Sequence, residues 1–80
     1  MSEPRASAGV VKRSLTIRGH RTSISLEDPF WRELQSIASA KGLSLARLVA
    51  DLDANRPDGT NLSSLLRVYV LEEALCRTAL

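Results

Sequence analysis

The feature that most constrains this fold is a short run in which apolar and polar residues alternate, directly before helical sequence. Ile24 and Leu26 lie on one side of the run, and Arg21, Ser23 and Ser25 lie on the other. A strand this short does not fold alone, and helices follow it at once, so its partner strand is expected from a second copy of the chain. Two copies paired antiparallel would bury the apolar residues against shared helices and present a polar face from both chains.

A second alternating run lies just upstream and ends at Arg18. Its apolar residues Leu15 and Ile17 occupy odd positions, whereas those of the downstream run occupy even positions. The phase must therefore change near Gly19, either through a bulge or through a tight hairpin turn in which Gly19 has a positive φ angle. In the hairpin, Arg18 is expected opposite Arg21, and this pair would repel unless an anion such as DNA phosphate lay nearby. Both alternatives place the apolar residues of the two runs on one face.

Three helices are predicted after these runs. The first begins around Glu27 and ends where Gly42 supplies a C-cap. Ser44 caps a second helix that ends near Ala54, and a third spans about residues 61–77. The third helix has too many apolar positions for a single stripe, so we expect it to be buried on several sides, between two protomers.

Composition excludes several classes of protein. The 80 residues allow one domain, for which core burial gives a thin stability margin, and dimerisation is the expected remedy. Cys76 has no disulfide partner and does not complete a zinc site with His20; we expect it to be a small buried hydrophobe and expect no metal or cofactor. No apolar stretch approaches the ~20 residues of a membrane span, and the N-terminus has no signal core, so we expect a cytoplasmic protein. No nucleophile elbow, phosphate loop or metal carboxylate pair is present, and we predict no catalysis.

Positive charge is concentrated in the first part of the chain. Residues 1–26 contain five basic residues and one acidic residue, a net charge of +4, whereas residues 27–80 contain six basic and eight acidic residues, a net charge of −2. This distribution places positive charge on the predicted ribbon, where a polyanion would bind. We expect residues 1–11 to form a flexible arm and residues 12–80 to form the domain.

These residues resemble the ribbon-helix-helix family of bacterial DNA-binding proteins, which includes the Arc and MetJ repressors. The alternating run at residues 21–26, the helix that ends at Lys41 and Gly42, and the turn through Leu43 into Ser44 carry the resemblance. More narrowly, residues 12–73 are similar to small ribbon-helix-helix proteins from alphaproteobacteria. The third helix is a departure from the family pattern, in which a longer second helix typically ends the domain.

The resemblance implies a mainly α fold with a short β ribbon, formed by intermolecular antiparallel strands in a dimer, plus the additional C-terminal helix. The outward strand residues would contact DNA bases, and these are Arg21, Ser23 and Ser25. Phosphate contacts are expected from Lys12, Arg13, Arg18 and the start of the second helix at Ser44 and Leu45. The expected dimer core contains Ile24, Leu26, Leu34, Leu48, Leu66 and Tyr69.

The leading hypothesis is a homodimeric regulator or repressor of transcription that reads the major groove of double-stranded DNA. Dimers could associate further on DNA and with the nucleoid. If about 6–10 phosphates were neutralised, binding should weaken by roughly 10³–10⁵-fold between 50 and 200 mM salt. The alternative is a protein-interaction module of the same fold, an antitoxin or adaptor, which uses its third helix to bind a protein partner.

Overall fold

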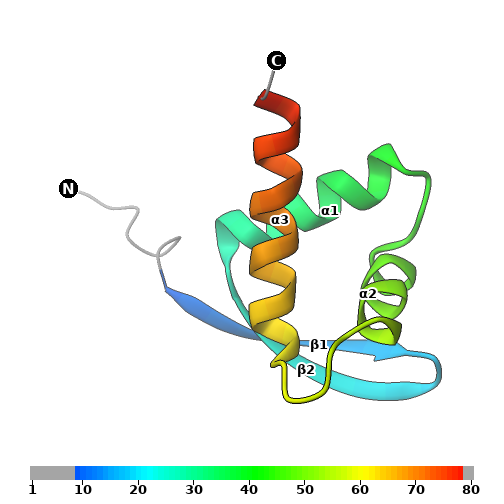
Figure 1. Ribbon diagram of the computed structural model, residues 1–80. Coiled ribbons are helices and arrows are strands. Elements are labelled where there is room, and N and C mark those ends of the chain that lie inside the picture. The colour runs from blue at the N-terminus through cyan, green and yellow to red at the C-terminus, as the bar shows by residue number, and fades with distance from the viewer. Residues whose placement is uncertain (1–8, 79–80) are drawn as a thin grey trace.

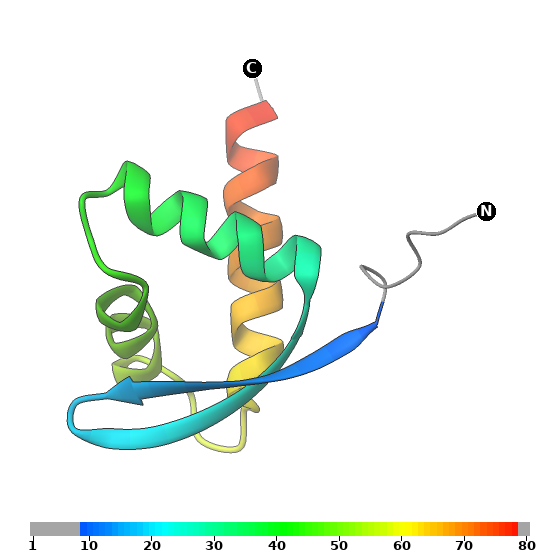
Figure 2. The same cartoon turned by 180° about the vertical axis from the view of Figure 1, so that it is seen from behind.

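The computed structural model describes residues 9–78 of the chain as a two-stranded ribbon with three helices on one side of it (Figures 1 and 2). This arrangement confirms the predicted ribbon and the predicted additional C-terminal helix. In chain order the elements are β1 (Val10–Ile17), β2 (His20–Glu27), α1 (Asp28–Ala40), α2 (Leu45–Ala54) and α3 (Leu62–Thr78).

The ribbon is an antiparallel hairpin built within one chain. Its last ladder pair joins Ile17 to His20, so Arg18 and Gly19 form a two-residue turn. Both turn residues have positive φ, 50° and 83°, as a type I′ turn requires. The hairpin, which the sequence left open beside a bulge, is therefore present, and its two-residue turn brings β1 alongside β2 at a small entropic cost. Pairing of residues 21–26 with a second copy stays a prediction.

The turn lies one residue earlier than in the hairpin that the sequence suggested, so the cross-strand partners shift by two residues. Arg18 lies in the turn and does not face Arg21, whose cross-strand partner is Thr16. The expected repulsion between two arginines is therefore absent from the ladder. A non-glycine residue at positive φ is uncommon, and for this reason the pattern pointed to a turn one position later.

One side of the ribbon faces the helices. Ile17, Ile24 and Leu26 are buried on this side, and Leu15 packs against the same core. The prediction that the apolar residues of both strands share a face is confirmed.

The end of α1 follows the predicted glycine cap. Gly42, at φ 71°, donates its N–H to the carbonyl of Ser39 at 3.0 Å, and Leu43 donates to the carbonyl of Ala38 at 2.9 Å. These two bonds form a Schellman motif, which satisfies carbonyl groups that the helix leaves unpaired.

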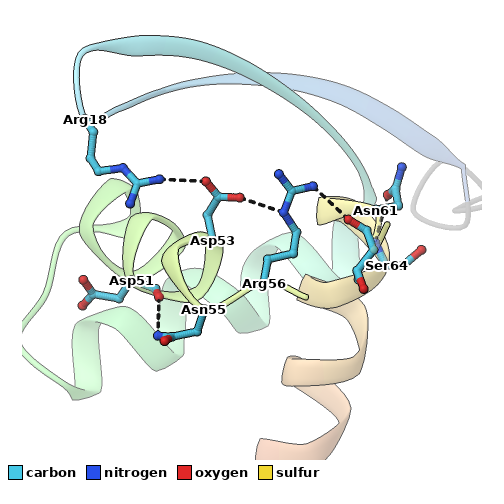
Figure 3. Close-up of polar contacts among 8 residues, drawn as sticks. Arg18, Asp51, Asp53, Asn55, Arg56, Asn61 and Ser64 are labelled. Carbon is cyan, nitrogen blue, oxygen red and sulfur yellow. Dashed lines mark hydrogen bonds and ion pairs between the residues drawn. The ribbon is translucent and has the colours of Figure 1, made fainter. Parts of the chain in front are cut away.

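Side chains cap the N-termini of the other two helices. Ser44 Oγ accepts a hydrogen bond from the N–H of Arg47 at 3.1 Å and so begins α2 as predicted. Asn61 Oδ1 accepts from the N–H of Ser64 at 3.2 Å and begins α3 (Figure 3). Each cap satisfies a backbone donor in the first turn of its helix.

The residues expected in a dimer core lie in the core of this single chain. Ile24, Leu26, Leu34, Leu48 and Leu66 are all buried, and Tyr69 is partly buried against them. Their burial therefore does not require a second chain.

Other predictions concern residues near the two ends of the chain. Residues 1–8 of the expected arm lie outside the described residues, and Val10 and Val11 belong to β1. Cys76 is exposed on α3, so the prediction of a buried thiol is wrong. Within residues 9–78, no helix combines the length and apolar character needed to cross a membrane.

Candidate nucleic-acid interface

The side of the ribbon that faces away from the helices is polar and positively charged. Across it, Thr16 pairs with Arg21, Ser14 with Ser23, and Lys12 with Ser25. We call these six residues the outward face. Five of them are exposed, Ser25 is half-buried, and none of the six is acidic. Neither Lys12 nor Arg21 takes part in an ion pair with any residue between 9 and 78.

Arg13 lies on the opposite side of the ribbon, among the helices. Its guanidinium forms an ion pair with Asp28 at the start of α1 and lies 4.6 Å from the ring centroid of Trp31. Its side chain is only 18% exposed. A cation held by a carboxylate and an aromatic ring contributes to packing, and this placement does not favour the expected phosphate contact of Arg13.

Arg18 connects the hairpin turn to the end of α2. Its Nη2 lies 2.9 Å from Asp53 Oδ2, and Asp53 Oδ1 lies 2.9 Å from Arg56 Nε (Figure 3). Arg56 also donates to the carbonyl of Thr60 at 2.9 Å, within the loop that leads to α3. Arg18 was expected to contact a DNA phosphate, but its charge is matched by Asp53 of the same chain. This ion pair holds the hairpin turn against α2.

The free edge of β2 at Ser25 is covered by α3. Ser25 donates its N–H to Ser63 Oγ at 2.9 Å, and its carbonyl accepts from Arg67 Nη2 at 3.1 Å. Arg67 Nε also lies 2.9 Å from Glu27 Oε1, and this hydrogen bond lowers the pKa of the Glu27 carboxyl below its ordinary value. The side chain of Ser25 stays on the outward face while its backbone is held by α3.

The N-terminus of α2 lies apart from the hairpin turn. Asp53, near the C-terminal end of α2, holds Arg18 of the turn, and a ten-residue helix is about 15 Å long. Ser44 is exposed and Leu45 is partly buried, and no hydrogen bond within the described residues joins either residue to the ribbon. The structure therefore shows Ser44 as a helix cap, and a phosphate contact there stays a prediction.

Ser14 and Thr16 are members of the outward face that the sequence analysis did not select. They became recognisable only once the hairpin was distinguished from a bulge, because the hairpin places even-numbered residues of β1 beside odd-numbered residues of β2. The alternation of Ser14 and Thr16 with Leu15 and Ile17 was the available signal.

Comparison with known proteins agrees with this architecture. A family model described as "Ribbon-helix-helix domain" matches residues 10–74. The chain belongs to the ribbon-helix-helix domain family. No curated protein is significantly similar to it.

A solved structure supports the same fold for this ribbon-helix-helix domain. It is the structure of an uncharacterized protein from Bordetella pertussis Tohama I, with a TM-score of 0.80 and 32% sequence identity. The match covers 94% of the present chain and 63% of the Bordetella protein, so the present chain spans less than two thirds of that protein's length.

Proposed function

We propose that this protein binds double-stranded DNA by placing the outward face of its ribbon in the major groove. A two-stranded β ribbon has the width that this groove accepts. The single observation that carries the proposal is the separation of charge across the ribbon. Arg13 and Arg18 are matched by carboxylates, whereas Lys12 and Arg21 have no carboxylate partner among residues 9–78.

Each residue of the outward face has a chemical role in this proposal. Arg21 donates two hydrogen bonds to guanine O6 and N7, and Lys12 binds phosphate as a point charge. The hydroxyls of Ser14, Thr16, Ser23 and Ser25 donate to or accept from base edges. Because one chain supplies both strands, β1 contributes to recognition together with β2.

The biological role follows from this chemistry and from the family. We infer a non-enzymatic regulator of transcription, a repressor, that acts as a cytoplasmic homodimer on a short inverted repeat. We further propose that the chain is more closely related to the alphaproteobacterial members of the family. Among the lysines and arginines of the ribbon, only Lys12 and Arg21 lack a carboxylate partner within residues 9–78. If both charges displace counterions from DNA, two chains have the effect of neutralising about four phosphates, which gives a salt dependence of roughly 10²-fold between 50 and 200 mM.

Selection from a random pool of duplex oligonucleotides tests the proposal. We expect the purified full chain to enrich a short sequence containing guanine, arranged as an inverted repeat. If no sequence is enriched, and a large excess of genomic DNA leaves the protein unbound in an electrophoretic mobility assay, DNA binding is excluded.

A second function is favoured by the exposed apolar side chains of α3, which would suit a protein-interaction module such as an antitoxin or adaptor. That hypothesis predicts that changes at Arg21 leave the protein's activity unaltered, whereas changes on α3 abolish capture of a defined protein partner.

A further inference from the structure

The helix α3 is apolar on two opposite sides. One side packs into the core through Leu62, Leu66 and Val70. At 100° per residue, Val68, Leu71 and Leu75 lie on the far side of the same helix. Their exposed fractions are 52%, 54% and 57%. We call these three residues the outer stripe.

We propose that the outer stripe binds the outer stripe of a second copy of this chain, with the two α3 helices parallel. The stripe residues are spaced by three and then four, which is the spacing of core positions in a two-stranded coiled coil. A two-fold axis parallel to α3 places each stripe residue against its own equivalent. The contact is therefore self-complementary, as a symmetric dimer requires.

Charges at the borders of the stripe favour the parallel arrangement. Arg67 lies on one border and Glu72 on the other, five residues apart, so parallel helices bring each Arg67 beside Glu72 of the second copy. Arg67 uses Nε and Nη2 within its own chain, which leaves the donors of Nη1 for the second copy. Antiparallel helices would instead bring the two Glu72 borders together and lose this attraction.

The parallel arrangement also has a geometric consequence, which rests on the proposed DNA-binding function. The helix α3 starts at the ribbon, where Ser63 and Arg67 hold Ser25, and extends away from it (Figures 1 and 2). Two parallel α3 helices therefore place both ribbons at the same end of the dimer. Both outward faces then point away from the helices toward one duplex, which suits an inverted repeat.

Disulfide cross-linking tests the orientation without DNA. In a Cys76→Ser background, Val68→Cys and Leu75→Cys are made separately and oxidised. Parallel helices place identical positions within disulfide distance, so each variant is expected to form a covalent dimer by itself. Ser36→Cys, an exposed position on α1, is the matched control and should remain uncross-linked. Cross-linking that occurs only when the Val68→Cys and Leu75→Cys proteins are mixed would show antiparallel helices and overturn the proposal.

Molecular mass in solution tests the surface itself. One helix per chain makes an interface at the small end of the usual range, so we expect a reversible dimer that dissociates at micromolar concentrations. Leu71→Gln should shift the dissociation constant at least tenfold toward monomer in sedimentation equilibrium. Val10→Gln, at a residue that is 57% exposed on the ribbon, should leave it unchanged. A monomeric wild-type chain, or a dimer insensitive to Leu71→Gln, would refute the interface whether or not the protein binds DNA.

Discussion

The two faces of the ribbon place basic residues in opposite circumstances. On the face toward the helices, Arg13 is held between Asp28 and the ring of Trp31 and is largely buried. On the outward face, Lys12 and Arg21 are exposed and have no carboxylate partner among residues 9–78. Neighbouring basic residues thus serve different purposes, since alternation along a strand sends one into the fold and the next toward solvent. Counting positive charge along the sequence does not distinguish them.

Truncation of a side chain should affect folding strongly on one face and weakly on the other. Ile24→Ala removes a buried side chain and should lower the free energy of unfolding by about 2–5 kcal/mol, whereas Ser23→Ala should change it by less than about 0.5 kcal/mol. Urea denaturation followed by Trp31 fluorescence measures both. If Ile24→Ala does not fold, Ile24→Val should show a loss of about 0.5–1.5 kcal/mol. Equal losses at Ile24 and Ser23 would contradict the assignment of the two faces.

DNA binding should show the reverse dependence. Arg21→Ala should weaken binding to the selected duplex by roughly 1–3 kcal/mol per chain and leave the free energy of unfolding unchanged. Arg13→Ala should instead destabilise the fold by about 1 kcal/mol and leave the affinity of the folded protein nearly unaltered. Fluorescence anisotropy and urea denaturation distinguish the two. Equal losses of affinity in both variants would show that Arg13 also contacts DNA.

The two-residue turn fixes the register of the two strands and therefore decides which residues lie on each face. It should be sensitive to substitution. Gly19→Ala forces a side chain onto a residue at φ 83° and should cost about 1–2 kcal/mol of folding free energy. Gly9→Ala, at a glycine without positive φ, is the control and should be neutral. Thermal unfolding measures both variants, and an unchanged midpoint for Gly19→Ala would argue against the type I′ turn.

The smallest expected effect is a pH dependence at the contact between the ribbon and α3. The pKa of Glu27 is lowered by Arg67, so this carboxylate contributes stability that is fully present above its ordinary pKa of 4.5 and is lost as the pH falls through the lowered pKa. The difference in midpoint between wild type and Glu27→Gln should therefore shrink as the pH falls below 4.5. Asp58→Asn, at an exposed residue that forms no ion pair within residues 9–78, should show no such trend, and a difference for Glu27→Gln that grows on acidification would contradict the pairing.

Local chemistry predicted much of the architecture. The glycine after Lys41, the serine cap at Ser44 and the opposite phases of the two apolar runs all act within a few residues, and the structure confirms each of them. The sequence also indicated that α3 carries more apolar residues than one stripe needs.

The features that the sequence did not predict depend on contacts between residues far apart in the chain. Whether Arg18 is free or paired depends on Asp53, 35 residues away, and whether Arg13 is buried depends on the start of α1. The turn could not be placed because Arg18 adopts a conformation usually reserved for glycine. For these reasons the prediction included arginines in the DNA-binding surface that the structure shows to be matched, and it omitted Ser14 and Thr16.

The most direct test compares two variants that lose the same charge from different parts of the molecule. Lys12→Gln/Arg21→Gln removes two positive charges from the outward face, and Arg32→Gln/Lys41→Gln removes two from exposed positions at the helices. Anisotropy titrations of duplex DNA at 50 and 200 mM salt should show that the first variant loses most of its affinity and most of the roughly 10²-fold salt dependence. The second variant should retain both. Equal losses in the two variants would show that net charge, and not the outward face of the ribbon, determines DNA binding.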